Sequence, residues 1–486
     1  LNNLVGLLYM PFMLRMMGQN EYGLYSLVAS VITYLTVLDL GFGNAIVRYT
    51  AKFRAEGKIN EQYDMFGMFL ILYSIVGVIT LLIGTGFYFN VDVLFDRAMT
   101  LEDLSKVRTM MLLMTVNLAF TFPMSVFGSI IVAYEDFVFQ KLVNITRIIL
   151  NPLVMIAMLM LGYRAIGMTV ITTLFNVVTL LVNCWYCFHK IHIRIYFGHF
   201  KWGFLKEVSI YSFWIFLNAI MDRIYWSSGQ FILGMYKGAV AVAVYAVAIQ
   251  LQGIYMSFST AISGVFLPKV TAMVAKENNE KAISDLFIRM GRIQYAIMAF
   301  ILTGFILFGK VFIYFWAGSD YDEAYYIALL FFIPLTIPLI QNLGIIILQA
   351  RNQMRFRCVL YVVIAFVSLG ISIPLARLYG GIGCALGTVF ALVVGQIIAM
   401  NIYYHRRIHI DIVRFWKEIF RMSLVPILLG GVGYCFLNMI TLTNAWELGL
   451  AILLFSLIYV PLFWYMGLNG YEQSLFREPL KRLLKI

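Results

Sequence analysis

The chain has 486 residues, of which 62% are hydrophobic and 12% are charged, and its formal net charge is +12. Soluble globular proteins carry about 25% charged residues, so this composition excludes a soluble protein and predicts a polytopic membrane protein. Apolar runs recur along the whole chain. No connection between them exceeds about twenty residues, which leaves no room for a soluble catalytic domain.

Fourteen apolar segments are predicted to be membrane-spanning helices, so the predicted fold class is all-α. The first segment, LNNLVGLLYMPFML, has neither a charged leader nor a small-residue cleavage site. We interpret it as a truncated first span rather than a signal peptide. The fourteen segments cover residues 1–14, 23–47, 65–89, 109–133, 142–163, 166–188, 208–234, 241–266, 283–308, 325–349, 358–376, 381–404, 422–440 and 446–467.

Lysine and arginine are distributed unevenly between the connections. The even-numbered connections and the C-terminal tail hold 27 of the 36 basic residues, the odd-numbered connections hold 8, and Arg223 lies within a segment. Because basic residues concentrate on the cytoplasmic side of membrane proteins, we predict that both termini are cytoplasmic. The net charge is therefore a topology signal, and nucleic acid is not a predicted partner.

The cysteines and histidines do not predict a metal site. All five cysteines lie in or at the ends of predicted spans, unlike the framework of a secreted protein. The stretch CWYCFHKIH, residues 184–192, holds two cysteines and two histidines too tightly spaced for a zinc pattern, and we interpret it as a helix end at the membrane surface. No HExxH, P-loop, GxSxG or dinucleotide motif occurs in a usable context, so we predict no metal, no cofactor and no covalent catalysis.

Residues 212–234, SFWIFLNAIMDRIYWSSGQFILG, carry Asp222 and Arg223 near the middle of an apolar segment. Each such group costs at least about 2.5 kcal/mol to insert, so a helix that only anchors a protein has no use for them. At helical spacing Asn218 and Asp222 share one face, and Arg223 begins an adjoining face that continues to Trp226, Ser227 and Gln230. This pattern indicates a polar cavity or pathway in which the two charged residues address different groups.

The two halves of the chain repeat weakly at an offset of about 216 to 220 residues. MMGQNEYGLYSLVAS (16–30) matches MYKGAVAVAVYAVAI (235–249), and GYRAIGMTVITTL (162–174) matches LYGGIGCALGTVF (378–390). Chance is the alternative, and the shared offset and order favour a true repeat. The repeat predicts two six-helix bundles, residues 1–207 and 208–405, related by a pseudo-two-fold axis along the membrane normal. Residues 406–486 would add two further helices and a cytoplasmic tail.

Residues 14–52, LRMMGQNEYGLYSLVASVITYLTVLDLGFGNAIVRYTAK, contain the elements G-x-x-x-Y-G-x-Y, L-D-L-G-F-G and A-I-V-R. A later segment reads N-A-I-M-D-R, and another reads G-A-x-A-V-A-x-Y. In this order and with fourteen spans, the chain resembles the polysaccharide (O-antigen type) flippases. Their superfamily also includes multidrug/toxin extruders and lipid II flippases.

The resemblance implies a function and a set of partners. The implied function is translocation of undecaprenyl-diphosphate-linked oligosaccharide from the cytoplasmic to the outer leaflet of the bacterial inner membrane. The implied mechanism is alternating access coupled to an H+ or Na+ gradient. The implied partners, besides membrane lipids, are a polysaccharide polymerase and glycosyltransferases of a pathway such as lipopolysaccharide synthesis.

A cavity for a diphosphate favours arginine, because the planar guanidinium binds phosphate oxygens bidentately and stays charged when desolvated. Arg223 is therefore the main candidate for substrate binding. The other candidates are polar residues in or near the spans: Arg15, Arg48, Arg147, Asn144, Asn151, Asn218 and Gln230. For Arg15, Arg48 and Arg147 the alternative is a snorkelling contact with lipid head groups. Asp222 and Asp39, the latter well inside the second span, are candidate ion-coupling residues.

The tenth segment contains IPLTIPLIQN, in which Pro334 and Pro338 lie one helical turn apart. Proline removes backbone hydrogen bonds and kinks a helix, so both are candidate hinge residues, and an ordinary membrane-helix proline is the alternative. Arg289 and Arg292 start the ninth segment. We interpret them as interfacial anchors rather than as substrate contacts.

Two other functions compete with a flippase. A multidrug or toxin extruder of the same superfamily would favour an acidic or aromatic cavity over a central arginine. A membrane-embedded glycan polymerase or glycosyltransferase would need catalytic residues on sizeable loops, which the chain lacks. A non-transporting scaffold leaves Asp222 and Arg223 unexplained. The sequence therefore favours a flippase and not an enzyme.

Overall fold

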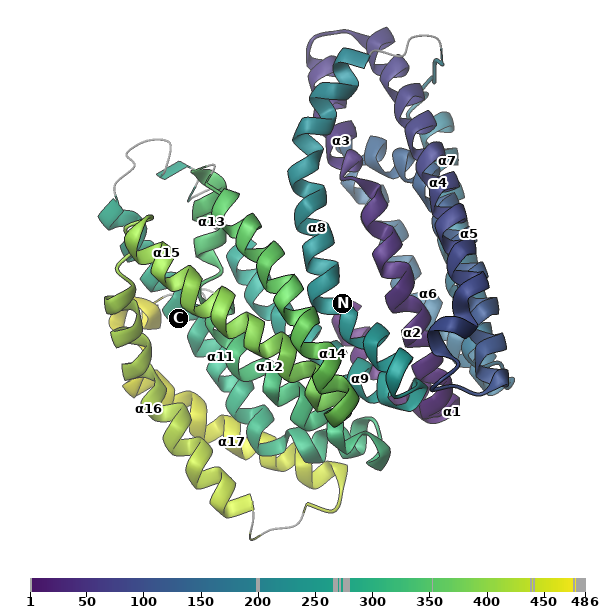
Figure 1. Cartoon of the computed structure of the whole chain (residues 1–486). Helices are drawn as coiled ribbons and strands as arrows, with labels where there is room; N and C mark the ends of the chain where they lie inside the picture. The colour runs from purple at the N-terminus through teal and green to yellow at the C-terminus, as the bar shows by residue number, and fades with distance from the viewer. Residues whose placement is uncertain are drawn as a thin grey trace. The chain divides into compact units, whose positions relative to one another are not determined.

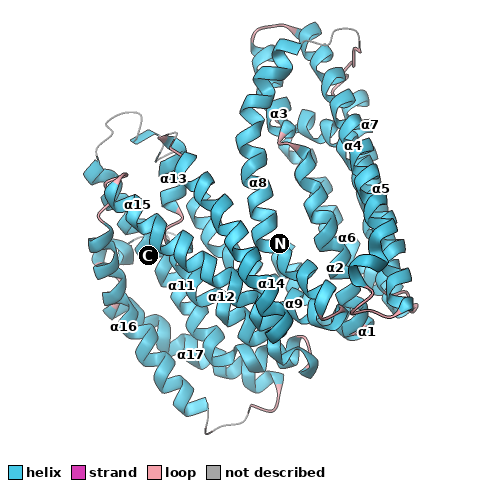
Figure 2. Cartoon of the chain, viewed as in Figure 1, coloured by secondary structure: helices cyan, strands magenta, loops and turns pink. Residues whose placement is uncertain are grey.

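The computed structural model describes residues 2–197, 202–264, 270, 272–273, 280–351, 353–437, 439, 442–474 and 477. Every regular element in this part of the chain is a helix, as Figure 2 shows. The prediction of an all-α fold is therefore confirmed. The helices form two compact units, which we call unit 1 and unit 2 and describe separately.

Unit 1 comprises residues Leu1–Ala246 together with Ala376–Gly381. Within it, α5 packs on α4 and α7, and α2 packs on α5 and α8. Its elements, labelled in Figure 1, are α1 (Asn2–Met17), α2 (Gln19–Leu35), η1 (Thr36–Asp39), α3 (Phe42–Ala55), α4 (Ile59–Phe95), α5 (Leu101–Ala133), α6 (Phe137–Met160), α7 (Ala165–His189), α8 (Trp202–Tyr236) and the first residues of α9 (Ala239–Gly264). Packing therefore includes α8 in unit 1. The two predicted bundles, residues 1–207 and 208–405, are defined by the repeat in the sequence and not by packing, so they stay a prediction.

Unit 2 comprises Val247–Leu375 and Ile382–Ile486. Helix α11 is its centre, because α12, α16 and α17 all pack on it. Besides the remainder of α9, its elements are α11 (Glu280–Trp316), η2 (Ser319–Tyr321), α12 (Asp322–Ile340), α13 (Leu343–Ala350), α14 (Arg355–Ala391), the π-helical η3 (Leu392–Ala399), α15 (Met400–Arg406), α16 (Ile412–Leu437) and α17 (Ala445–Met466).

In the described part of the chain, eleven helices are long and apolar enough to cross a membrane. One of them, the run Arg355–Arg406, contains two predicted spans, 358–376 and 381–404. The backbone breaks between them at Gly380, whose φ is 59°. The chain is thus a multi-pass membrane protein. The number fourteen stays a prediction.

The second predicted span, residues 23–47, is not the continuous helix that we expected. Helix α2 ends at Leu35, η1 follows, and Leu40 and Gly41 then have φ values of 54° and 71°. Residues in this left-handed region cannot continue a right-handed helix, and glycine adopts it without steric cost. The L-D-L-G element therefore forms a break in the span. Asp39 lies at this break and not in a helix interior.

Glycines allow close approach between α2 and α9 and between α8 and α9. A Cβ atom at Gly23 would lie 1.8 Å from the carbonyl oxygen of Ala239, and one at Gly229 would lie 2.5 Å from the hydroxyl oxygen of Tyr245. Both distances are clashes, so neither position accepts a side chain without movement. Small residues at such contacts are typical of closely packed membrane helices. The close approach explains the second glycine of the G-x-x-x-Y-G-x-Y element.

The segments matched by the repeat begin helices in similar ways. Gly18 and Gly238 have φ values of 80° and 83° and precede α2 and α9 respectively. In the second pair, α7 begins at Ala165, and helical backbone resumes after Gly380, at the residue aligned with Ala165. These similarities agree with an internal repeat. Superposition of two six-helix bundles stays a prediction.

Candidate functional site

Helix α8 has one packed face and one open face. Met221, Tyr225 and Ser228, at spacings of four and three residues, are buried. Asp222 and Arg223 are exposed, and they lie about 100° and 200° around the helix from Met221. The packing of α8 on α2 therefore leaves both charged side chains on the open face.

Other candidates on α8 extend this open face. Trp226, Ser227 and Gln230 are half-buried and, at helical spacing, lie on the same side of α8 as Asp222 and Arg223. The side chain of Asn218 lies outside the described residues. On its packed side α8 lies very close to α2, because a Cβ atom at Gly234 would lie 2.5 Å from Leu27 of α2. This contact determines which face of α8 is packed and which is open.

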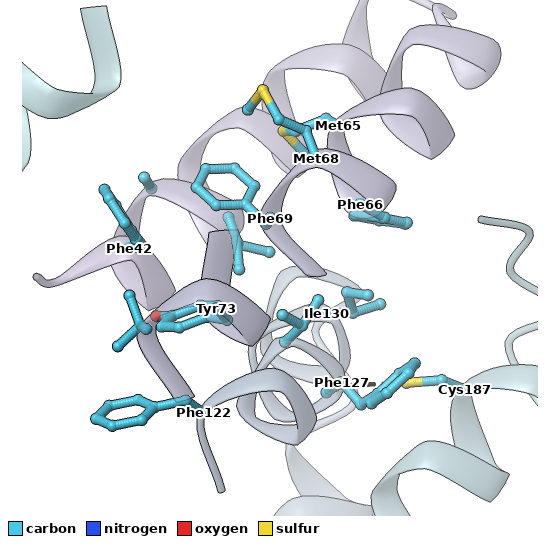
Figure 3. Close-up of a cluster of buried hydrophobic side chains, with 14 of the residues drawn as sticks. Phe42, Met65, Phe66, Met68, Phe69, Tyr73, Phe122, Phe127, Ile130 and Cys187 are labelled. Carbon is cyan, nitrogen blue, oxygen red and sulfur yellow. Dashed lines mark hydrogen bonds between the residues drawn. The ribbon is translucent and has the colours of Figure 1, made fainter. Parts of the chain in front are cut away.

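Asp39 is half-buried at the helix break and has one strong partner. Its Oδ1 accepts a 2.5 Å hydrogen bond from the hydroxyl of Tyr73 on α4. Tyr73 is completely buried, stacks on Phe122 of α5 and meets Phe42 edge-on, as the cluster in Figure 3 shows. Because η1 also packs on α8, the structure brings Asp39 and the charged helix into the same part of unit 1. Sequence reasoning missed Tyr73, since one tyrosine in an apolar run gives no pattern.

The candidate arginines of unit 1 do not all converge. Arg48 is exposed on α3, with its guanidinium carbon 5.7 Å from the centre of the Tyr49 ring, and α3 packs on α8. Arg48 and Arg223 therefore lie on neighbouring helices. Arg15 is exposed in the last turn of α1, and Arg147 is half-buried on α6, which packs on α1 and α7.

The two candidate asparagines on α6 differ in exposure. Asn144 is exposed, whereas Asn151 is half-buried. The Oδ1 atom of Asn151 is shielded from solvent and has no hydrogen-bond partner among the described residues. A buried acceptor of this kind costs about 1–3 kcal/mol, so α6 holds an unused polar atom next to Arg147.

A polar seam between α5 and α7 was not predicted. The Nδ2 atom of Asn176 donates hydrogen bonds to Oδ1 of Asn117 at 2.9 Å and to Oγ1 of Thr121 at 2.7 Å. Such side-chain bonds join helices within membranes. The signal was present in the sequence, because Thr169, Thr173 and Asn176 recur at helical spacing on one face of an apolar segment.

Glu21, within the N-E-Y-G part of the motif, is buried and has a structural role. Its Oε1 accepts a hydrogen bond from Lys106 Nζ at 2.7 Å, and its Oε2 accepts one from the backbone N–H of Ala165 at 3.2 Å. Ala165 is the first residue of α7, so the carboxylate lies at the positive end of that helix dipole. Glu21 thereby joins the starts of α2, α5 and α7.

In unit 2, α12 continues through Pro334 and Pro338 and ends at Ile340. The turn formed by Gln341 and Asn342 then separates it from α13. The interruption in the tenth predicted span therefore comes after the second proline and not at either proline. A hinge role for Pro334 and Pro338 stays a proposal.

Neighbouring helices satisfy the last carbonyl groups of α12. The hydroxyl of Ser259 on α9 donates a 2.7 Å hydrogen bond to the Leu339 carbonyl. When the Gln294 amide on α11 is placed in the orientation that satisfies both its oxygen and its nitrogen, the nitrogen donates to the carbonyl oxygens of Leu339 at 3.1 Å and Ile340 at 3.0 Å. Ser259 and Gln294 are both buried. The end of α12 is thus capped by uncharged side chains.

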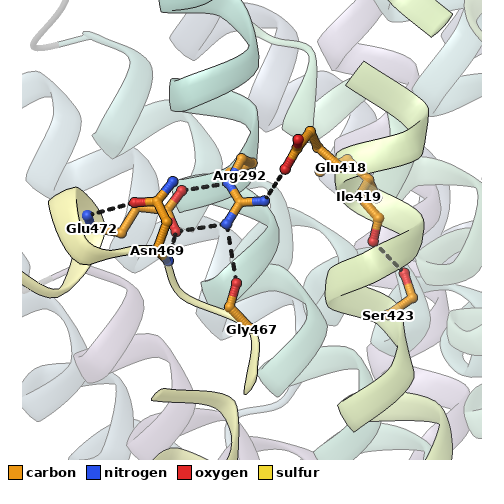
Figure 4. Close-up of polar contacts among 7 residues, drawn as sticks. All are labelled: Arg292, Glu418, Ile419, Ser423, Gly467, Asn469 and Glu472. Atoms are coloured by element: carbon orange, nitrogen blue, oxygen red, sulfur yellow. Dashed lines mark hydrogen bonds and ion pairs between the residues drawn. The ribbon is translucent and has the colours of Figure 1, made fainter. Parts of the chain in front are cut away.

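Arg292 forms a buried ion-pair network, shown in Figure 4, and our interpretation of it as an interfacial anchor is wrong. Its Nε and Nη2 donate to the two carboxylate oxygens of Glu472 at 2.6 and 2.9 Å, and its Nη1 donates to Glu418 at 2.6 Å. Nη2 also donates to the carbonyl of Gly467. Since every guanidinium nitrogen is engaged, Arg292 joins α11 to α16 and to the segment after α17.

The CWYCFHKIH stretch contributes Cys187 to the hydrophobic core of unit 1. Cys187 is completely buried, lies beside Phe127 in Figure 3, and donates a 3.4 Å hydrogen bond to the Phe127 carbonyl. Across the part of the chain that the structure describes, no group of three or more His, Cys, Asp or Glu side chains could hold a metal ion. Cys187 therefore contributes to packing between α5 and α7.

Comparison with solved structures defines the class of fold. The chain is similar to the lipid II flippase MurJ in an inward closed conformation, with a TM-score of 0.73, 15% identity, and coverage of 96% of this chain and 97% of that one. It is also similar to an inward-facing multidrug resistance MATE family transporter of the MOP superfamily, with a TM-score of 0.62, 15% identity, and coverage of 86% and 96%. The chain therefore has the fold of these flippases and transporters.

Sequence comparison identifies the family. The family model described as "Polysaccharide biosynthesis protein" matches residues 1–274, which is more than half of the chain. The chain belongs to this polysaccharide biosynthesis protein family. A curated relative, the uncharacterized membrane protein EpsK of Bacillus subtilis (strain 168), is 21% identical over 316 residues, which span 64% of this chain and 62% of EpsK.

Proposed function

We propose that the chain is a flippase that moves undecaprenyl-diphosphate-linked oligosaccharide from the cytoplasmic to the outer leaflet of the bacterial inner membrane. Membership of a polysaccharide biosynthesis family and a flippase-like fold support this proposal. The observation that carries it is the exposure of Arg223 on the open face of an apolar helix. A guanidinium that stays charged inside a membrane protein suits a phosphate, whose oxygens it binds bidentately.

In this proposal each half of the sequence forms a bundle and the two alternate access to the substrate. Arg223 and Arg48 bind the diphosphate, and Asp222 or Asp39 binds the coupling ion, H+ or Na+. The further substrate contacts are the remaining candidates: Arg15, Arg147, Asn144, Asn151, Asn218 and Gln230. Both termini are cytoplasmic, and a polymerase and glycosyltransferases of a surface polysaccharide pathway act with the flippase.

The direct test is flipping of a lipid-linked oligosaccharide in proteoliposomes by wild-type protein and three variants. Arg223→Ala should abolish flipping, and Arg223→Lys should restore only part of it, because lysine lacks the bidentate fork. Arg406→Ala, which removes an exposed arginine at the end of α15, is the matched control and should flip at the wild-type rate. Wild-type flipping by Arg223→Ala would reject the role of Arg223.

The same preparation separates the proposed function from its nearest rival. A multidrug or toxin extruder would move a cationic dye across the membrane and leave the lipid-linked oligosaccharide in its original leaflet. A flippase would do the reverse. In the flippase, Asp222→Asn should alter the dependence of flipping on the ion gradient while substrate binding persists, because the substitution keeps the shape and removes the charge.

A further inference from the structure

The contact between Asp39 and Tyr73 connects a carboxylate at a helix break to a buried aromatic cluster. We infer that Tyr73 is a positioning residue, whose hydroxyl holds the Asp39 carboxylate at the break and favours its charged form. Asp39, Tyr73 and the contact between them all lie within unit 1. Its consequence for transport, a dependence of flipping on the protonation of Asp39, rests on the proposed function.

The geometry leaves the Tyr73 hydroxyl little freedom. Its ring is completely buried, with ring-centre distances of 6.3 Å to Phe122 and 5.8 Å to Phe42. Figure 3 shows the same ring beside Phe69, in the preceding turn of α4. A side chain packed on several sides cannot follow a partner that moves, so the 2.5 Å bond fixes where the Asp39 carboxylate lies.

The backbone supports this position from the other side. Asp39 is the last residue of η1, and the left-handed Leu40 and Gly41 turn the chain immediately after it. The carboxylate is therefore held by a turn on its own chain and by a hydroxyl from α4. A hydrogen bond donated to a carboxylate stabilises the charged form relative to the protonated form.

Several elements with titratable side chains surround the break. The elements packed on η1 are α2, α4 and α8, and α3 follows the break. The titratable or charged side chains that these elements carry include Tyr34 on α2, Tyr73 on α4, Arg48 and Tyr49 on α3, and Asp222, Arg223 and Tyr225 on α8. Among the described residues, the hydrogen bond to the Asp39 carboxylate comes from Tyr73.

The test is labelling of Asp39 by dicyclohexylcarbodiimide, which reacts with protonated carboxyl groups in membrane proteins. The carboxyl proton moves to the reagent, and the carboxylate adds to its central carbon, so no further reactant is needed. Labelling of purified protein in detergent is measured by peptide mass spectrometry across a pH series. In Tyr73→Phe, which keeps the ring and removes the hydroxyl, the pH of half-labelling should rise by about one unit.

Unit 2 offers a matched control. Tyr255 is buried, stacks on Phe332 with ring centres 4.3 Å apart, and shares a 2.7 Å hydrogen bond with Thr336. Tyr255→Phe removes an equivalent buried hydroxyl far along the chain from Asp39. It should leave the pH of half-labelling unchanged, which separates positioning from a general loss of stability.

The outcomes are decisive in each direction. An unchanged half-labelling pH in Tyr73→Phe, an equal rise in Tyr255→Phe, or Asp39 labelling without any pH dependence would overturn the inference. In proteoliposomes, the pH profile of oligosaccharide flipping by Tyr73→Phe should shift upward as labelling does. A labelling shift in a protein that flips no oligosaccharide would support the positioning of Asp39 and reject the proposed function.

Discussion

In the part of the chain that the structure describes, each unit has an interrupted predicted span, and the two interruptions are built differently. In unit 1 the break follows η1, uses the left-handed residues Leu40 and Gly41, and carries the carboxylate of Asp39. In unit 2 the break at Gln341 and Asn342 has ordinary negative φ values, and its carbonyl groups are capped by uncharged side chains. The break in unit 1 therefore carries an ionisable group, whereas the described side chains that cap the break in unit 2 are uncharged.

The difference shows two ways to build a break in a membrane helix: one satisfies the free backbone groups, and the other leaves an ionisable side chain at the break. Broken helices in transporters expose backbone groups and helix ends, which bind ions or substrates when left open. In unit 2, Ser259 and Gln294 satisfy those groups and leave little for a ligand. In unit 1 the polar group at the break is a side chain whose charge can change. The substitutions below test this contrast, beginning with the largest expected effect.

Replacing Gln294 by leucine should have the largest effect on stability. The change leaves the buried carbonyls of Leu339 and Ile340 without a donor from α11, which should lower the free energy of unfolding by about 2–4 kcal/mol. The matched control is Gln252→Leu on α9. Gln252 is buried too, but its Oε1 has no partner among the described residues, so its loss should be neutral or stabilising. Unfolding titrations in mixed micelles would measure both, and equal losses would contradict the capping role.

Gly41→Val should destabilise unit 1 because it strains the backbone at the break. A β-branched residue at a φ of 71° is strained, so the variant should lose about 1–3 kcal/mol of stability. Gly86→Val on α4 is the control, because Gly86 has helical φ and a Cβ atom there would meet no atom within 4 Å. The same unfolding titration applies. A Gly41→Val protein as stable as the control would show that the break does not need a left-handed residue.

Ser259→Ala should cost less than Gln294→Leu. It removes the 2.7 Å bond to the Leu339 carbonyl, which still receives bonds from Gln294 and from the Asn342 backbone, so the expected loss is about 1–2 kcal/mol. Ser456→Ala on α17, where the hydroxyl is exposed and bonds within its own helix, should be nearly neutral. If Ser259→Ala lost as little stability as Ser456→Ala, Ser259 on α9 would not contribute to the cap.

Asn342→Ala should have the smallest effect. It removes a 3.0 Å bond to the Ser263 hydroxyl but imposes no backbone strain, because the φ of Asn342 is −59°. A loss of about 0.5–1 kcal/mol is expected. A loss larger than that of Gly41→Val, in the same titrations, would reverse the contrast between the two breaks.

Composition and hydropathy predicted the class of protein and the positions of most helices, because membrane insertion constrains apolar length strongly. The open face of α8 also followed from spacing, since Asp222 and Arg223 cannot pack against an apolar neighbour. Contacts between segments could not be predicted. Tyr73 meets Asp39 from 34 positions away and Glu472 meets Arg292 from 180 positions away, and neither pair leaves a local pattern. Arg292 was accordingly misinterpreted.

The membership of unit 1 has a consequence for biogenesis. Residues 376–381 belong to it, and Arg377 among them donates a 2.7 Å hydrogen bond to the Tyr236 hydroxyl at the end of α8. Chains are made from the N-terminus, and their domains generally fold as units during synthesis. Here the ribosome must add residue 381 before every part of unit 1 exists. The first unit is therefore completed only after residues 247–375 of the second have been synthesised.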